Sequence, residues 1–252
     1  MLLSVIIPAF NEEKYLKHTI ERIEQALQEH AGAAISWEFI VCDNNSSDKT
    51  SEIASQMGAK VAFEPINQIS RARNTGAAPA EGDWLLFIDA DSYPPPELIR
   101  ETLALIHSGE FIGCGATVRA EGGTLWNRLR IERLNPFMKW FGWCGGLYIL
   151  CEKTAFQAIK GFSPALYAYE EIDFVIRLRR LARKKKLKFT VLHQHPVVTS
   201  GRKGNYSAGQ WVTLVISNVL ALLFFMLHYF FPEKWVPKSL PKALGYWYNG
   251  QR

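Results

Sequence analysis

The most informative part of this 252-residue chain is Gly82-Asp83-Trp84-Leu85-Leu86-Phe87-Ile88-Asp89-Ala90-Asp91. Its centre, Trp84 to Ile88, is a short run of bulky apolar residues between polar ones, which predicts a buried β-strand. Asp89 and Asp91 follow where that strand ends, and in open α/β sheets ligands bind beyond the carboxyl ends of strands. Because neighbouring carboxylates repel each other without a nearby cation, the pair predicts a site for Mg²⁺ or Mn²⁺ and phosphate oxygens. A solvated aspartate-rich turn is the alternative interpretation.

Apolar runs and helical segments alternate along the first half of the chain. Strands are expected at residues 2–7, 37–42, 60–63 and 84–88, where short runs rich in branched and aromatic residues occur. Between them, a stripe of Leu16, Ile20, Ile23 and Leu27 has helical spacing, and further helices are expected near 53–57, 70–80 and 96–106. This alternation predicts an α/β fold with a mostly parallel, doubly wound sheet.

The second half of the chain is less regular. We expect strands at 111–119, 145–151 and 188–192, one aromatic amphipathic helix over 125–141, and helices at 154–159 and 174–184. No flexible linker divides the first 205 residues, so they are expected to form one domain, with 206–252 as a separate C-terminal segment.

Composition and charge are those of a globular protein with an anionic partner. The chain is 48% hydrophobic and 21% charged, with a net charge of +5. Basic residues concentrate between Arg177 and Lys188, which fits phosphates or an anionic membrane surface, and we expect no nucleic-acid partner. The N-terminus lacks the basic region and cleavage site of a signal peptide. The four cysteines lack metal-type spacing and lie in apolar surroundings, so the chain is expected to be cytoplasmic: Cys42, Cys114, Cys144 and Cys151.

The C-terminal segment changes in character. Residues 211–231 contain no Asp, Glu, Lys or Arg and are numerous enough to cross a bilayer as a hydrophobic helix. Aromatic residues interleaved with lysines follow, as in an interfacial anchor: Trp235, Tyr246, Trp247 and Tyr248. We therefore expect membrane contact through 211–248, spanning or in the plane, at the cytoplasmic face. A buried core helix or a dimer interface is the alternative interpretation.

Polar side chains recur at the ends of successive predicted strands. Asn11 and Glu12 follow the first strand, Asp43 follows the second, and Asp89 and Asp91 follow the fourth. In a parallel sheet these positions meet in one crevice. Carboxylates there can accept hydrogen bonds from ribose hydroxyls or a base N–H, and a metal held by carboxylates can hold a diphosphate. This layout predicts a nucleotide-diphosphate site.

Three sequence blocks resemble family-2 glycosyltransferases of the GT-A fold. They are Ser4-Val5-Ile6-Ile7-Pro8-Ala9-Phe10-Asn11-Glu12, the polar loop Asp43–Thr50, and Arg73-Asn74-x-Gly76 continuing through Gly82-Asp83 to Asp89-Ala90-Asp91. Their order and spacing match the family over about the first 205 residues, which makes the joint match specific. The resemblance implies metal-dependent, inverting transfer of a sugar from a nucleotide-diphosphate donor to an acceptor hydroxyl of a glycan, lipid or small molecule, as in cell-envelope or lipid-linked glycan synthesis.

The resemblance also implies roles for individual residues. The nucleotide-sugar would contact the first two blocks, with Asp43 on the base, Arg73 on the phosphate side and Asp89 on the ribose or the metal. Asp91 would bind Mg²⁺ or Mn²⁺. Ser200-Gly201-Arg202-Lys203 resembles the basic segment that closes over the diphosphate. The full donor-binding set implied is Pro8, Phe10, Asn11, Glu12, Asp43, Arg73, Asp89, Arg202 and Lys203.

The family's catalytic base lies in a Glu-Asp pair before a helix, and the matching segment here is Glu170-Glu171-Ile172-Asp173. Glu171 stands where Asp is more usual, so Glu170 and Asp173 remain alternative bases. An acidic helix N-terminus, favoured by the helix dipole, would explain the same cluster.

Two other functions fit parts of the pattern. A nucleotidyltransferase would want a glycine-rich, basic loop after the first strand, which Pro8–Glu12 does not supply. A non-catalytic, membrane-associated nucleotide-binding scaffold would not need the retained carboxylates.

Overall fold

The computed structural model describes residues 1–32, 35–133, 135–142, 144–167 and 169–201. The expectations for 206–252, including the apolar run 211–231, and for Arg202 and Lys203 therefore lie outside the described residues. Within the described ranges, none of the helices has the length and apolar character needed to span a bilayer.

The described strands form one eight-stranded sheet in the order β3-β2-β1-β4-β7-β6-β8-β5. Residues 84–88 form the predicted strand, which is buried throughout and lies near the middle of the sheet. The strand bounds are β1 Leu2–Ala9, β2 Ser36–Asp43, β3 Lys60–Phe63, β4 Trp84–Ile88, β5 Ser92–Tyr93, β6 Phe111–Glu121, β7 Tyr148–Glu152 and β8 Lys188–Ser200.

The sheet is mixed rather than uniformly parallel. The predicted parallel pairing is confirmed for β1 with β2, β1 with β4 and β2 with β3. β7, however, runs antiparallel to both of its neighbours, β4 and β6, and the short β5 runs antiparallel to β8. Because β7 reverses direction between them, β4 and β6 point the same way as β1 and β2. The carboxyl ends of these four strands consequently lie along one edge of the sheet.

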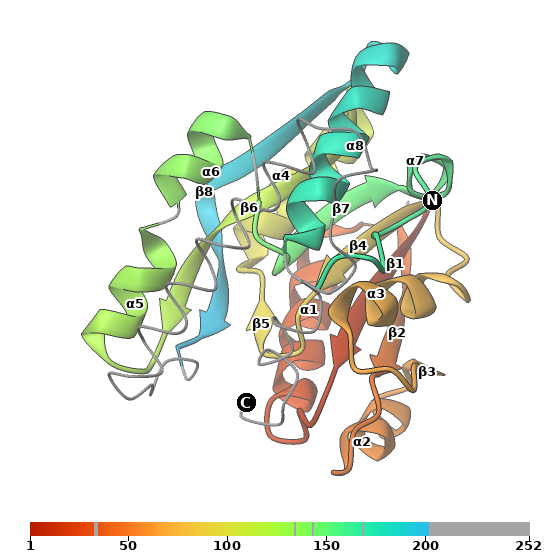
Figure 1. The fold of residues 1–252 in the computed structure, drawn as a ribbon, viewed down its shortest axis with the longest axis vertical. Coiled ribbons are helices and arrows are strands. Elements are labelled where there is room, and N and C mark those ends of the chain that lie inside the picture. The colour runs from red at the N-terminus through yellow and green to blue at the C-terminus, as the bar shows by residue number, and fades with distance from the viewer. Residues whose placement is uncertain (33–34, 134, 143, 168, 202–252) are drawn as a thin grey trace.

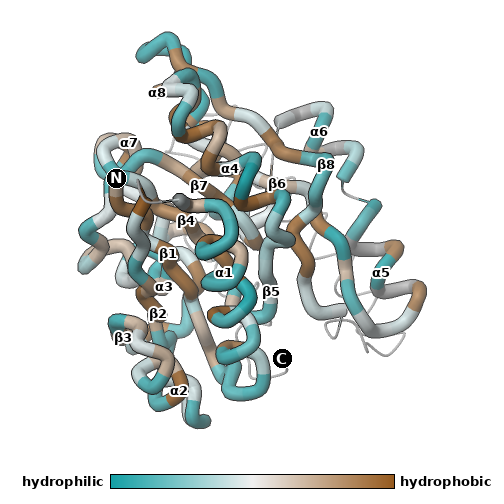
Figure 2. Tube along the Cα trace, turned by 180° about the vertical axis from the view of Figure 1, so that it is seen from behind, coloured by the Kyte–Doolittle hydropathy of each residue, from teal (hydrophilic) through white to brown (hydrophobic). Residues whose placement is uncertain are grey.

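Helices cover both faces of this sheet (Figures 1 and 2). α1 and α4 pack together on one face, while α3, α7 and α8 lie on the other. The predicted stripe of α1 is confirmed, since Leu16, Ile20, Ile23 and Leu27 are buried. The helix bounds are α1 Leu16–His30, α2 Thr50–Gln56, α3 Ile69–Ala77, α4 Pro96–Ser108, α5 Leu125–Glu132, α6 Asn135–Phe141, α7 Lys153–Ala158 and α8 Glu170–Lys185.

Three elements of the second half differ from the expected ones. The single helix expected over 125–141 is two helices, α5 and α6, because Pro136 cannot donate the hydrogen bond of a helix interior but fits the first turn of a new helix. α8 begins at Glu170 rather than at residue 174, so the acidic cluster forms its first turn. β8 continues to Ser200 rather than ending at residue 192, because its second half pairs with β6 and β5.

An aromatic cluster joins the central strand to α8. Phe87 of β4 lies 5.1 Å from Phe162 between ring centroids, and Phe162 stacks on Phe174 of α8 at 4.2 Å. Phe87, Phe162 and Phe174 are fully buried. Each buried ring stabilises the fold by roughly 1.5–3 kcal/mol, with about 0.5–1.5 kcal/mol more for an aromatic pair. This packing fixes the acidic first turn of α8 relative to the end of β4.

Candidate active site

The loops that follow β1 and β2 are joined by hydrogen bonds. The Asn11 N–H donates to Ser46 Oγ at 3.0 Å, and the Asn11 side-chain oxygen accepts from the Ser47 N–H at 2.8 Å. The Glu12 N–H donates to Thr50 Oγ1 at 2.8 Å. Asn11 has a φ of 54°, a conformation that asparagine tolerates better than most residues. The serines and threonine of the Asp43–Thr50 block therefore fix the loop that carries Asn11 and Glu12.

Two buried carboxylates result at neighbouring strand ends. β1 and β2 pair in register at Ala9 and Asp43, so the residues that follow each strand lie side by side. Glu12 is 5% exposed and Asp43 is 6% exposed, and Asp43 Oδ1 accepts the Ser46 N–H at 2.9 Å. Pro8 is buried within β1 and Phe10, directly after the strand, is half-buried. The structure thus brings the predicted nucleoside-side residues of the first two blocks together.

Asp89 and Asp91 lie at the end of β4, as predicted. The Asp89 side chain is 21% exposed, whereas Asp91 is buried. The end of β8 closes on this position, because the Ser200 N–H donates to the backbone oxygen of Asp91 at 3.1 Å and Ser92 bonds to Thr199 at 2.8 Å. The described part of β8 therefore ends beside Asp91.

The donor set at this strand end suits a metal that is shared with a ligand. In the described part of the chain, no group of three or more His, Cys, Asp or Glu side chains is arranged to hold a metal ion. Mg²⁺ is commonly held by one or two carboxylates, with water and substrate phosphates completing its coordination. Asp89 and Asp91 fit that kind of site and do not fit an all-protein cage.

Arg73 of α3 links the two acidic groups of the site. Its Nη1 donates to Glu170 Oε1 at 3.0 Å, and its Nη2 donates to Asp89 Oδ1 at 3.3 Å and to the Gly146 carbonyl at 3.0 Å. The guanidinium is buried, 5.2 Å from the centre of the Phe162 ring. Burial alone would lower the pKa of Arg73, but the charges of Asp89 and Glu170 raise it. Arg73 is thus a buried cation beneath the site, and its predicted contact with phosphate stays a prediction.

The three candidate bases, Glu170, Glu171 and Asp173, differ in their ion-pair partners. Glu170 is buried and ion-paired with Arg73, and Asp173 is ion-paired with Arg177 at 2.6 Å. Among the described residues, no ion pair is made by Glu171. Burial, reinforced by the negative charge of Glu170 and opposed by Arg73, raises the pKa of Glu171 to about 8. The Glu171 carboxylate is therefore suited to exchange a proton near neutral pH.

The turn before α8 holds an unusual backbone conformation. Tyr169, which precedes the helix, has a φ of 61°, in the left-handed region that costs a bulky residue roughly 1–3 kcal/mol. Its carbonyl accepts the N–H groups of Ile172 and Asp173, each at 3.1 Å. Such strain persists where surrounding contacts determine it, and it clusters at functional sites.

Asn74 and Gly76 of the third sequence block have packing roles. Asn74 exchanges two hydrogen bonds with the backbone of Phe162, at 2.8 and 2.9 Å. A Cβ at Gly76 would lie 2.8 Å from Ile6 Cγ2, so glycine allows α3 to approach β1 closely. Together with Arg73, these residues make α3 the support of both the sheet edge and the segment before α8.

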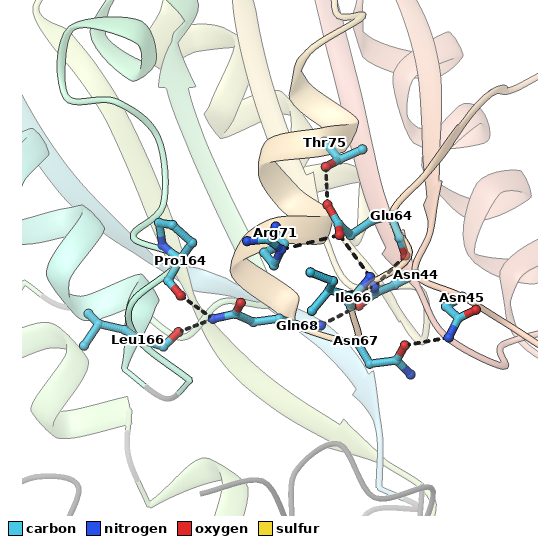
Figure 3. Close-up of polar contacts among 10 residues, drawn as sticks. All are labelled: Asn44, Asn45, Glu64, Ile66, Asn67, Gln68, Arg71, Thr75, Pro164 and Leu166. Atoms are coloured by element: carbon cyan, nitrogen blue, oxygen red, sulfur yellow. Dashed lines mark hydrogen bonds and ion pairs between the residues drawn. The ribbon is translucent and has the colours of Figure 1, made fainter. Parts of the chain in front are cut away.

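Two residues that the sequence analysis did not single out, Asn44 and Gln68, extend this support (Figure 3). The Asn44 side chain donates to the carbonyls of Glu64 and Ile66 and accepts the Gln68 N–H at 3.0 Å. The buried Gln68 side chain donates to the carbonyls of Pro164 and Leu166, at 2.9 and 3.0 Å. The loop after β2 is therefore connected through Gln68 to the segment that leads into α8. Asn44 stands next to Asp43, but no feature of the sequence marks Gln68.

Another buried carboxylate, that of Glu64, completes the same hydrogen-bond network. Glu64 accepts the hydroxyl of Thr75 at 2.7 Å and the Ile66 N–H at 3.0 Å, and it pairs with Arg71 at 3.4 Å (Figure 3). These contacts stabilise the turn between β3 and α3, which contains Gln68.

The fold is that of the GT-A glycosyltransferases. Glucosyl-3-phosphoglycerate synthase from Mycobacterium tuberculosis, solved with Mg²⁺ and uridine diphosphate, aligns over 88% of this chain and 78% of its own, with a TM-score of 0.61 and 18% identity. S. aureus TarS residues 1–349, solved with UDP-GlcNAc, aligns over 88% of this chain and 67% of its own, with a TM-score of 0.59 and 20% identity.

The chain belongs to glycosyl transferase family 2, whose sequence profile matches residues 4–192. A dolichol-phosphate mannosyltransferase of Pyrococcus furiosus is 33% identical over 132 residues, which are 50% of this chain and 36% of the relative. An undecaprenyl-phosphate 4-deoxy-4-formamido-L-arabinose transferase of Pectobacterium carotovorum is 27% identical over 200 residues, which are 75% of this chain and 59% of the relative. The chain thus spans less than two thirds of the length of either protein.

Proposed function

We propose that this glycosyltransferase moves a sugar from a nucleoside-diphosphate donor to an acceptor hydroxyl, with inversion at the anomeric carbon. The observation that carries the proposal is the meeting of carboxylates from separate elements at one edge of the sheet. Glu12 follows β1, Asp43 ends β2, and Asp89 and Asp91 follow β4. Arg73 joins Asp89 to Glu170 in the first turn of α8.

The donor nucleoside lies over the ends of β1 and β2 in this proposal. Pro8 and Phe10 supply apolar contact, and Asn11, Glu12 and Asp43 supply hydrogen-bond acceptors for the base and ribose. Two observations support this placement. The side chains lie together at one edge of the sheet, and hydrogen bonds join the loops that carry them. Arg202 and Lys203 follow the end of β8 in sequence and are proposed to neutralise the diphosphate.

Asp91, assisted by Asp89, is proposed to hold Mg²⁺ or Mn²⁺ together with the donor diphosphate. When bound, the ion supplies neutralising charge to the departing nucleoside diphosphate. The chain's own contribution is to keep the two aspartates oriented, through Arg73 on Asp89 and through the closure of β8 on Asp91.

Glu171 is proposed as the general base. Its carboxylate accepts the proton of the acceptor hydroxyl while the hydroxyl oxygen bonds to the anomeric carbon. The bond from that carbon to the diphosphate oxygen breaks, and its electron pair leaves with the nucleoside diphosphate. The raised pKa of Glu171 supports this role, as do the ion pairs that engage Glu170 and Asp173 elsewhere.

The acceptor class is proposed from the relatives. Dolichol phosphate and undecaprenyl phosphate are named in two of them, which favours an acceptor that is lipid-linked or close to a membrane. We also propose that 1–205 is the catalytic domain, that 211–248 contacts the membrane, and that catalysis takes place at the cytoplasmic face.

The test is release of nucleoside diphosphate by the purified full-length chain from a panel of nucleotide-sugars, with and without Mn²⁺. The proposal predicts metal-dependent release from one donor class, lost in Asp91→Ala. Asp83→Asn is the matched control, because Asp83 directly precedes β4, whereas Asp91 follows its other end. Release of pyrophosphate from a nucleoside triphosphate and a sugar phosphate would instead identify a nucleotidyltransferase. Binding of nucleotide-sugars without turnover of any would favour a non-catalytic scaffold.

A further inference from the structure

The helices α5 and α6 expose large apolar side chains that the folded domain does not use. Leu125 and Leu129 of α5 are 67% and 51% exposed, and Trp140 of α6 is 86% exposed. The helices are attached to the sheet by other residues. Asn135 exchanges hydrogen bonds with the backbone of Val118, at 2.8 and 2.9 Å, and Met138 is buried in the core. Leu125 and Leu129 are four residues apart on α5, and Trp140 lies on the next helix. Large apolar side chains exposed together on a protein surface mark an interaction site.

Exposed basic residues lie on the same two helices and the turn between them. Arg128 of α5, Arg133 after it and Lys139 of α6 are exposed. The acidic side chain of α5, Glu132, is turned to the sheet, where it accepts the Ala120 N–H at 3.1 Å. A helical surface with large apolar and basic side chains complements the boundary between the headgroups and acyl chains of an anionic bilayer.

The path of the chain supports a membrane as the binding partner of these two helices. The Gly201 N–H donates to the Glu121 carbonyl at 2.7 Å, and a Cβ at Gly123 would lie 2.3 Å from the Gly201 oxygen. The described chain therefore ends against the turn that precedes α5, as the end of β8 beside α5 in Figure 1 illustrates. The uncharged run 211–231 begins only ten residues later in the sequence.

We propose that Leu125, Leu129 and Trp140, with Arg128, Arg133 and Lys139, form a surface that lies on an anionic lipid bilayer; we name it the α5–α6 surface. A second copy of the chain is a poorer occupant, because a two-fold contact would place the same basic residues opposite one another. The inference goes beyond the proposed function and does not depend on it, since lipid binding is measured without donor or acceptor.

The α5–α6 surface also lies toward the candidate active site. β6, which leads into α5, ends at the same sheet edge as β4. Asp91 at the end of β4 accepts the Ser200 N–H, one residue before the contact of Gly201 with Gly123. A bilayer on α5 and α6 would consequently be near the strand end that carries Asp91.

The experiment is vesicle flotation of the full-length chain with phosphatidylcholine alone and with phosphatidylcholine containing phosphatidylserine. One variant combines Arg128→Gln, Arg133→Gln and Lys139→Gln, and a second combines Leu129→Glu and Trp140→Glu. The control is Phe63→Glu, because Phe63 is 58% exposed on the edge strand β3, remote from this surface. Residues 202–252 are unchanged in every protein, so differences between proteins report on the α5–α6 surface.

Removal of three basic residues should weaken binding to the anionic vesicles by roughly 100-fold and leave binding to neutral vesicles unchanged. The apolar variant should bind both kinds of vesicle more weakly than wild type, because 211–248 is retained, and the control should bind as wild type. Thermal unfolding of each variant near the wild-type temperature shows that the fold is intact. Wild-type binding by both surface variants would overturn the proposal. So would a light-scattering result in which these variants lose a dimer but keep their lipid affinity.

Discussion

Substitution of Arg73 by methionine tests whether this buried cation holds the site together. Met keeps the apolar contact with Phe162 but leaves Glu170 without its ion-pair partner and the Gly146 carbonyl without its donor. Removal of one partner of a buried ion pair costs roughly 3–5 kcal/mol of unfolding free energy. For a chain of this size that corresponds to roughly 10 °C in melting temperature.

The measurement is urea unfolding followed by circular dichroism, with Arg71→Met as the matched control. Arg71 is 37% exposed and pairs with Glu64 at 3.4 Å, so its loss should cost less than about 1 kcal/mol. The double variant Arg73→Met with Glu170→Gln should recover part of the loss, because the uncompensated buried charge is then gone. If Arg73→Met costs no more than Arg71→Met, or if the double variant is less stable than the single one, the assigned role of Arg73 is wrong.

Three further predictions concern the base and the residue that supports it. Glu171→Gln should abolish transfer while nucleotide binding persists. In the wild type, kcat should rise as the pH increases through about 8, because burial and the charge of Glu170 keep Glu171 protonated below that pH. A Glu171→Gln enzyme with near-wild-type turnover, or a kcat that is independent of pH in this range, would exclude it as the base. Gln68→Ala should lower kcat by roughly tenfold, with little change in nucleotide affinity, because it frees the segment before α8. Gln56→Ala on the exposed side of α2 is its control, and equal losses of kcat and nucleotide affinity would show a merely structural role.

Local sequence features predicted much of the sheet edge where the candidate site lies. The run 84–88 is a buried strand with Asp89 and Asp91 at its end, and α1 buries the predicted stripe. These features depend on residues close together in sequence, where apolar periodicity is informative. The direction of β7 was not predictable in this way, since strand direction depends on partners that are distant in sequence.

The contacts that support the candidate site were harder to predict from the sequence, because they also join residues that are distant in sequence. Arg73 matched a motif, but its position between Asp89 and Glu170 joins residues as far as 97 positions apart. Gln68 reaches Leu166 across 98 positions, and a single glutamine carries no signal of such a contact. The left-handed backbone of Tyr169 is equally unexpected, because tyrosine has no intrinsic preference for it.

We propose that the carboxyl edge of β1, β2 and β4 binds a nucleoside diphosphate together with a divalent metal. Calorimetric titration of the full-length chain with uridine diphosphate, in Mn²⁺ and in excess chelator, tests it most directly. Uridine diphosphate should bind only when the metal is present, and this binding should be lost in Asp91→Ala and survive in Glu171→Gln. Equal affinity for uridine diphosphate with and without metal, unchanged in Asp91→Ala, would contradict it.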